Sequence, residues 1–312
     1  MIVALAGGVG GARLAVGLAA VLPPSGLTVV VNTGDDFEHH GLAISPDLDT
    51  VMYTLAGIAN PVAGWGRADE TWNFMSALEE LGGDAWFRLG DRDLTVHVLR
   101  TELLRRGVPL SAITRRLMSR LGIAHAVIPM SDSPVRTRVR TAQGGELAFQ
   151  DYFVRLRCKP RVSGFRFAGS RNAKIPPDLK RILRKPVEAV LICPSNPYVS
   201  IAPILSVREI REWLRQRSFP VVAVSPIIGG KALKGPAAKM MRELKVSATA
   251  LGVARHYGDL VDGWVIDRKD EKLQRAIELE GASVIVTDTI MKARAKSTAL
   301  AKQVIAFARA LA

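Results

Sequence analysis

A short apolar run followed at once by glycines and a helix constrains this chain more than any other feature. Residues 2–6 (IVALA) are typical of a buried strand, residues 7–13 (GGVGGAR) form a glycine loop, and residues 14–21 continue as an apolar helix. Glycine lets the backbone approach a bound group closely, and a helix start offers free N–H donors to phosphate. The order strand, glycine loop and helix predicts an α/β, Rossmann-like fold with a mostly parallel sheet.

This loop fits a phosphate group without matching the two commonest nucleotide signatures. The dinucleotide fingerprint requires a third glycine where Arg13 stands and an acid after the second strand, where Asn32 stands. A P-loop requires Gly-Lys-Ser/Thr, which is missing. NAD is therefore disfavoured, and Arg13 is either a fixed charge for a phosphate or a surface arginine.

An acid-rich stretch follows the second predicted strand, residues 27–31. Residues 32–50, NTGDDFEHHGLAISPDLDT, contain the four aspartates Asp35, Asp36, Asp47 and Asp49. Loops at the carboxyl ends of parallel strands collect ligands, and Mg²⁺ is held by one or two carboxylates together with substrate phosphates. The alternative is that Ser45, Pro46 and Asp47 only start the next helix. We expect Asp47 to cap that helix and Asp49 to face the crevice.

Length, composition and cysteine count favour one cytoplasmic domain. The chain has 312 residues, 48% of them hydrophobic, and no apolar run reaches the ~18 residues of a membrane span. Its two cysteines, Cys158 and Cys193, are far apart in the sequence, which suggests a reducing compartment. We expect a single Rossmann-like domain over residues 1–312, with a helical insert at about 60–122, a hairpin and basic segment at about 135–185, and no membrane partner.

Charge is distributed unevenly along the chain. Residues 1–100 hold 12 acids and 5 bases, whereas residues 101–312 hold 17 acids and 38 bases. This asymmetry suits a metal on one side of a site and an anionic ligand on the other. Residues 151–185 alone carry 11 bases and 2 acids, which indicates either a nucleic-acid surface or a solvated basic face. The absence of a nucleic-acid motif favours the solvated face.

The predicted insert contains helices at residues 71–81, 93–106 and 110–121. Trp65, between two glycines, either stacks on a flat ring or fills the base of its loop. Residues 86–93 (WFRLGDRD) have the composition of a recognition loop, or of a helix start capped by Asp93. After the insert, residues 135–150 predict a hairpin with Arg136, Arg138 and Arg140 on one solvated face.

The second half of the chain repeats the alternation of strands and helices. Strands are expected at residues 187–193, 221–224, 261–267 and 283–287, with a closing helix at 293–311. Two strand-end loops, PSNP at 194–197 and SPIIGGKALKGP at 225–236, are rich in Ser, Asn, Gly and Lys. They predict a second anion site, with amide donors from Gly229 and Gly230 and charges from Lys231 and Lys234. The alternative is a solvated loop with two incidental lysines.

Taken together, these blocks resemble the phospholactate transferase family of deazaflavin coenzyme F-420 biosynthesis. The matching segments, in order along most of the chain, are GGVGGAR (7–13), NTGDD (32–36), SPDLDT (45–50), GWG (64–66), FRLGDRDL (87–94), PSNPYVSI (194–201) and SPIIGGKALKGP (225–236). The resemblance implies a Rossmann-like sheet with a helical insert. It also implies that a ribityl hydroxyl of the deazaflavin Fo attacks a guanosine-diphospho-hydroxyacid, which releases GMP and forms a phosphodiester.

The resemblance also assigns roles to residues. Asp35, Asp36 and Asp49 are the expected catalytic and Mg²⁺-binding acids, and Asp49, Arg88 and Trp65 are expected at Fo. The expected donor-binding residues are Gly8, Gly10, Gly11, Arg13, Ser195, Asn196, Gly229, Gly230, Lys231 and Lys234. The hydroxyacid stays open between lactate, enolpyruvate and glycerate, and a homodimer is the assembly to test. The alternative function is a regulatory protein of the same fold that binds a nucleotide or nucleotide sugar without catalysis.

Overall fold

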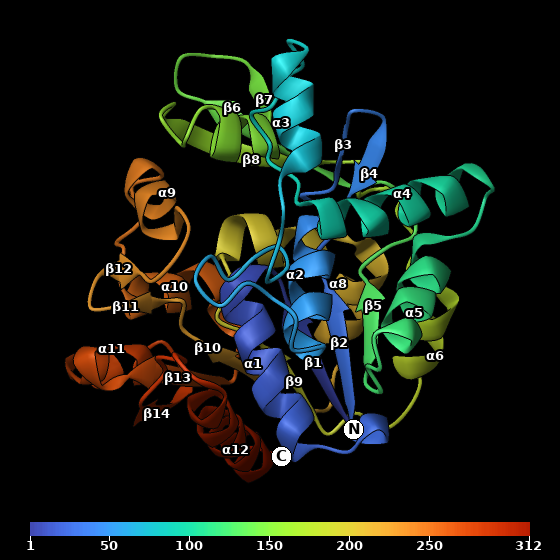
Figure 1. Cartoon of the computed structure of the whole chain (residues 1–312). Helices are drawn as coiled ribbons and strands as arrows, with labels where there is room; N and C mark the ends of the chain where they lie inside the picture. The colour runs from blue at the N-terminus through green and yellow to red at the C-terminus, as the bar shows by residue number, and fades with distance from the viewer.

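The computed structural model, which describes residues 1–312, is built on one seven-stranded parallel sheet (Figure 1). The strand order is β14-β13-β10-β9-β1-β2-β5. The strands are β1 (Ile2–Ala6), β2 (Leu27–Val31), β5 (Ala126–Pro129), β9 (Ala189–Ile192), β10 (Val221–Val224), β13 (Gly263–Asp267) and β14 (Ser283–Thr287). This sheet confirms the predicted α/β Rossmann-like fold.

The strands are mostly apolar because helices cover both faces of the sheet. In β1, Ile2 and Ala4 join the core on one face, whereas Val3 and Leu5 join the core on the other. The helices α1 (Gly8–Val21), α5 (Leu110–Arg120) and α12 (Arg294–Ala310) cover the first face. The helices α7 (Ala202–Ser206), α8 (Arg208–Arg215) and α10 (Ala250–Tyr257) cover the second.

The order of the strands reverses at β1. This strand pairs in parallel with β2 on one side, where Ile2 lies opposite Leu27, and with β9 on the other, where Ile2 lies opposite Ala189. In open α/β sheets, ligands bind outside the carboxyl ends of the strands at such a switch point. Those ends point to the top of Figure 1, where residues 73–80 (α3), 37–44 (β3 and β4) and 136–168 (β6 to β8) lie.

The helical insert begins after α2 (Pro46–Leu55) and contains α3 (Asn73–Glu80), α4 (Asp91–Arg105) and α5. The starts of α3 and α4 cap each other. Asp91 accepts hydrogen bonds from the backbone N–H groups of Asn73 and Phe74, and Glu70 accepts from those of Arg92 and Asp93. The expectation that Asp93 caps α4 is therefore wrong, because the cap comes from outside the helix.

Three small antiparallel units complete the carboxyl side of the sheet. The predicted hairpin, β6 (Arg136–Thr141) and β7 (Glu146–Ala148), gains a third strand, β8 (Val162–Ala168). The hairpins β3 (Phe37–His39) with β4 (Leu42–Ile44), and β11 (Ile227–Ile228) with β12 (Lys231–Ala232), were not predicted. The remaining helices are α6 (Pro177–Ile182), α9 (Ala237–Glu243) and α11 (Gln274–Glu278).

None of the helices has both the length and the apolar character needed to span a lipid bilayer.

Candidate functional site

Four buried aspartates gather at the carboxyl end of β2. Asp35 and Asp36 lie in the loop that leaves the strand, and Asp47 and Asp49 lie in the first turn of α2. Each is 5–7% exposed. The Ser45 hydroxyl donates to Asp36 Oδ2 at 2.8 Å, so the start of α2 and the loop after β2 are joined by a side chain. The sequence stretch 32–50 thus folds back on itself into one acid cluster.

Burial and mutual repulsion make the ionised form of three of these acids unfavourable. Burial raises the pKa of Asp36 to about 7, although the nearby charge of Arg136 opposes this. Burial also raises the pKa of Asp47 to about 6, against hydrogen bonds from Asn32 and Gly8. The pKa of Asp35 is raised by burial and by the charge of Asp47. Oδ1 of Asp35 and Oδ1 of Asp36 are buried without any hydrogen-bond donor. A bound cation would offset both the repulsion and the missing donors.

Asp47 does not cap α2. Its Oδ1 accepts from the Gly8 N–H at 2.8 Å, and its Oδ2 accepts from Asn32 Nδ2 at 2.9 Å. A carboxylate at this place meets the positive end of α1, where a negative charge is stabilised. One of the amides expected to hold a phosphate, that of Gly8, is therefore used by the protein itself.

Asp49 is paired, contrary to the expectation that it faces the crevice freely. Arg100, on α4, donates from Nη1 to Asp49 Oδ2 at 3.0 Å and from Nη2 to Asp49 Oδ1. The Arg100 side chain is 2% exposed and that of Asp49 is 7% exposed. This two-point contact is strong and directional because the guanidinium fork matches a carboxylate.

The pair continues into a buried polar network along α4. His97 Nδ1 lies 3.3 Å from Arg100 Nη1, and His97 Nε2 lies 3.4 Å from Asp93 Oδ1. The Tyr53 hydroxyl donates a hydrogen bond of 2.5 Å to the same Asp93 oxygen. Asp49, Asp93 and His97 each offer a possible metal-ligand atom, and these atoms lie within 4.8 Å of one another. Arg100 already neutralises Asp49, so a second cation there would meet its positive charge. The free oxygens of Asp35 and Asp36 have no such positive charge bound to them.

The glycine loop packs against the loop after β9. The Gly7 N–H donates to Ser195 Oγ at 3.1 Å, and the Ser195 hydroxyl donates to the Gly7 carbonyl at 2.8 Å. A Cβ at position 10 would lie 2.2 Å from the Pro194 carbonyl oxygen, so only glycine fits. Asn196 accepts from the Tyr198 N–H at 3.0 Å and shapes its own turn. Five of the residues expected to bind the donor substrate are thus brought together at the switch point: Gly8, Gly10, Gly11, Ser195 and Asn196.

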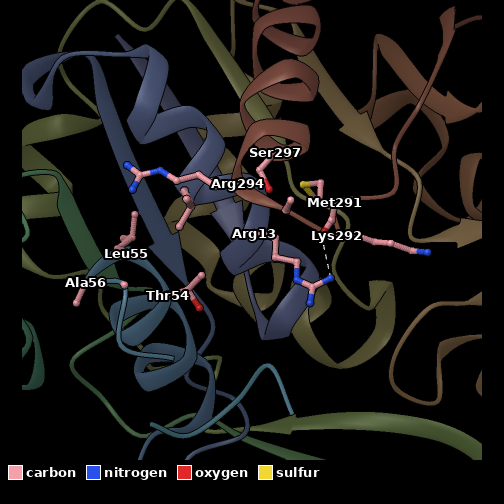
Figure 2. A pocket seen from close by; sticks show the side chains of 11 residues that line it. Arg13, Thr54, Leu55, Ala56, Met291, Lys292, Arg294 and Ser297 are labelled. Atoms are coloured by element: carbon pink, nitrogen blue, oxygen red, sulfur yellow. Dashed lines mark hydrogen bonds between the residues drawn. The ribbon is translucent and has the colours of Figure 1, made fainter. Parts of the chain in front are cut away.

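Arg13 lies apart from this group. Its Nη1 donates to the Met291 carbonyl at 2.9 Å, beside a cavity of about 310 Å³ between the end of α2 and the start of α12. Figure 2 shows the guanidinium turned toward Met291, with Lys292 and Arg294 pointing away from each other. Arg13 therefore joins α1 to the segment before α12 instead of reaching the acid cluster.

The second predicted anion loop approaches the insert. Lys234 Nζ donates to the carbonyl oxygens of Val62, at 3.2 Å, and Ala63. The Gly229 N–H is used by Asp270 Oδ2, 2.9 Å away, whereas Lys231 is exposed. Gly230 has a φ of 76° and turns the β11–β12 hairpin. Lys234 thus connects the loop after β12 to the loop of the insert that contains Trp65. The anion-binding role of residues 225–236 stays a prediction.

The expected Fo residues fall into separate places. Trp65 is 52% exposed in the loop that Lys234 contacts. Arg88 lies over the ring of Trp72, with 4.5 Å from its guanidinium carbon to the ring centroid. Trp86 and Phe87 pack on the β3 hairpin next to the acids, where the Phe87 and Phe37 ring centroids are 4.8 Å apart.

Residues of the hairpin and of the basic segment, within 135–185, also lie beside the acid cluster. Gln150 Nε2 lies 3.4 Å from the Asp35 carbonyl oxygen, and the Arg155 guanidinium lies 6.0 Å from the Trp86 ring centroid. Burial raises the pKa of Asp36, and Arg136, which is half-buried, is close enough to oppose that rise. The expectation that the face with Arg136 is simply solvated is therefore wrong at this end of β6.

Sequence reasoning missed Arg100, His97, Arg136 and Gln150 as site residues. A signal existed for the first two, because Asp93, His97 and Arg100 follow the four-and-three spacing of one helix face, and a polar stripe on that face needs a partner. No comparable local signal marks Arg136 or Gln150, whose proximity to the acids arises only from the folding of β6 and β7 over the sheet.

Fold and site together define a doubly wound α/β protein with a buried acid cluster beside a glycine loop at the switch point. A solved structure of a UPF0052-family protein from Bacillus halodurans has a similar fold, with a TM-score of 0.64 at 13% identity, over 97% of this chain and 98% of that one.

The family is given by the sequence. Residues 2–305 match the profile of the CofD family, described as 2-phospho-L-lactate transferase, and the chain belongs to this family of transferases. It is 44% identical over 311 residues to a phosphoenolpyruvate transferase of Kitasatospora aureofaciens, covering 96% of this chain and 97% of that one. It is 40% identical over 299 residues to a 2-phospho-L-lactate transferase of Methanosarcina mazei, covering 96% and 97%. These relatives confirm the family that the sequence motifs indicated.

Proposed function

We propose that the chain transfers a phospho-hydroxyacid group from a guanosine-diphospho donor to the ribityl hydroxyl of the deazaflavin Fo. The reaction releases GMP and forms a phosphodiester, as a step of coenzyme F-420 biosynthesis. The group is phosphoenolpyruvyl, phospholactyl or phosphoglyceryl, and the names of the two relatives support the first two.

The acid cluster is the observation that carries this proposal. Asp35 and Asp36 each keep one buried carboxylate oxygen without a donor, next to the glycine loop where phosphates bind in this fold. A protein that only binds nucleotides has no need of free carboxylate oxygens that can hold a metal ion. Phosphoryl transfer uses them, because it depends on positioning the reactants and on neutralising the charge of the phosphate.

Mg²⁺ fits the two free oxygens, since it prefers carboxylate ligands together with substrate phosphates. Asp35 and Asp36 would hold it, and when bound it would supply positive charge to the phosphate oxygens. Both oxygens of Asp49 already accept hydrogen bonds from Arg100. The proton of the attacking hydroxyl would therefore go to Asp35 or Asp36, at a carboxylate oxygen that does not hold the metal.

The aromatic rings beside the acids suit the flat deazaflavin. Phe37 directly follows Asp36 and packs with Trp86 and Phe87. Apolar ring surfaces of this kind bind flat heterocycles by stacking. We propose that Fo lies against this cluster, with its ribityl chain directed to the acids, and that the guanosine diphosphate lies on the side of Gly10 and Ser195.

The test is a reaction of purified protein with Fo and each of the three donors, with Mg²⁺ and with a chelator. We expect GMP and one phosphodiester of the corresponding mass, both dependent on Mg²⁺. Asp36→Asn should lower kcat by about 10²-fold or more, the scale of a lost acid–base contribution. Asp69→Asn is the matched control, because Asp69 is exposed with a φ of 52°, a conformation that asparagine also adopts. Binding of GDP without GMP release from any donor would refute the proposal in favour of a regulatory binding protein.

A further inference from the structure

Strand β6 carries arginines whose positive charges have different surroundings. Arg136, Arg138 and Arg140 alternate with Thr137 and Val139, which are buried. Arg140 is exposed and pairs with Glu146 at 3.3 Å. Arg136 and Arg138 are half-buried and form no ion pair. Arg136 is close enough to Asp36 for their charges to interact, but it makes no ion pair with it. A half-buried arginine without an ion-pair partner is unfavourable unless a ligand supplies the negative charge.

The start of β6 is fixed to the acid loop. The Thr137 N–H donates to the Gly34 carbonyl at 2.7 Å, and a Cβ on Gly34 would lie 2.7 Å from Thr137 Oγ1. Arg136, the first residue of β6, is therefore adjacent in the chain to a residue that contacts the loop of Asp35 and Asp36 directly. Its Nη1 donates to the Val135 carbonyl at 3.0 Å, which leaves most of its guanidinium N–H groups for a ligand.

Two of the transferred groups of the proposed function share one chemical feature. Phosphoenolpyruvate and 2-phospho-L-lactate both carry a carboxylate on the carbon that bears the phosphate oxygen. When the phosphorus is at the acid cluster, this carboxylate lies only a few bonds away. Among four buried aspartates a further carboxylate is repelled unless a cation receives it, and a guanidinium does so with two parallel hydrogen bonds.

We propose that Arg136 binds the carboxylate of the transferred group, with Arg138 as a second positive charge about 7 Å further along the strand. This inference rests on the proposed function and adds to it the residue that selects donors bearing a carboxylate. The phosphate end of the group would then lie at Asp35 and Asp36, which would hold the metal, and its carboxylate would lie at Arg136.

The experiment compares the wild-type protein, Arg136→Gln, Arg136→Lys and the control Arg140→Gln, an exposed arginine on the same face of the same strand. Each is assayed with the free-acid donor and with its methyl ester, and each is titrated with GDP, which has no carboxylate. Thermal melting of each variant checks folding. A lost hydrogen-bonded charge contact corresponds to a fall of about 10–100-fold in kcat/KM.

We expect wild type and Arg140→Gln to prefer the free acid over the ester by about 10–100-fold. Arg136→Gln should lose this preference and use both donors equally, mainly through a higher donor KM, with GDP affinity unchanged. Arg136→Lys should recover part of the preference, because it restores the charge without the fork.

An equal loss on both donors would overturn the inference, and so would a matching loss of GDP affinity, which would place Arg136 at the diphosphate. An unchanged preference in Arg136→Gln would also overturn it while leaving the proposed function intact. Failure of the wild-type protein to release GMP from any donor would instead refute the proposed function, and the inference with it.

Discussion

Replacing Asp49 by asparagine tests the buried pair with Arg100. The substitution keeps the shape of the side chain but removes its charge and one of the two oxygens that accept from the guanidinium. Arg100 is then left as an uncompensated charge in a place where its side chain is 2% exposed. Breaking one partner of a buried ion pair typically costs about 3–5 kcal/mol.

This cost converts into a measurable change in melting temperature. The entropy of unfolding is about 2.1 cal/mol/K per residue, so a chain of 312 residues has about 0.65 kcal/mol/K. We therefore expect Asp49→Asn to lower the Tm by roughly 5–8 °C.

Differential scanning calorimetry of a double-mutant cycle provides the assay. Asp49→Asn and Arg100→Met should each be destabilising, and the double variant should recover much of the loss because it removes both charges. If Asp49→Asn melts within about 1 °C of wild type, or if the two losses simply add, Asp49 and Arg100 do not form the pair described here.

Three further predictions follow from contacts at the site. Lys234→Ala should speed backbone amide exchange in residues 60–66, because Val62 and Ala63 lose their donor, whereas Lys231→Ala should not; equal exchange in both would refute the contact. Gly10→Ala should lower the Tm and the affinity for GDP, because its Cβ would lie 2.2 Å from the Pro194 carbonyl oxygen; Gly164→Ala, with no atom nearer than 3.8 Å, is the control, and equal behaviour would contradict the close packing. Chelator-treated protein should become less stable as pH rises from about 4 to about 7, because folded Asp36, whose pKa is raised to about 7, keeps a proton that the unfolded chain has released. Melting curves across this range should show a shallower decline for Asp36→Asn, and a slope unchanged by that substitution would show that Asp36 is not responsible.

The sheet could be predicted from the sequence because its signals are local. The strands at Ile2–Ala6 and Leu27–Val31 are buried along their whole length and contain Thr28 as their one polar residue, and the structure has them at the predicted bounds. The hairpin β3–β4 escaped prediction because its strands have three residues each and are held by packing against Trp86 and Phe87 from another part of the chain.

The same distinction applies to the site. The acids were visible because they stand within nineteen residues that follow a strand. Their partners were not visible, because Arg100 lies 51 positions from Asp49. The spacing of Asp93, His97 and Arg100 indicates a polar helix face, but only the fold pairs Arg100 with Asp49 and brings Arg136 close to Asp36. Sequence patterns thus identify which groups are charged, whereas the structure shows which of those charges are already balanced.

The reciprocal caps of the insert have a consequence for its motion. Since Asp91 holds the start of α3 and Glu70 holds the start of α4, neither helix can move away without exposing the free amides of the other. The two helices are thus coupled and would move together as one unit. Arg100 and the Trp86 loop, which belong to this unit, would approach or leave the acids in a single movement. Any opening that admits a flat acceptor would then also loosen the charge partner of Asp49, so that access to the site and its electrostatics change together.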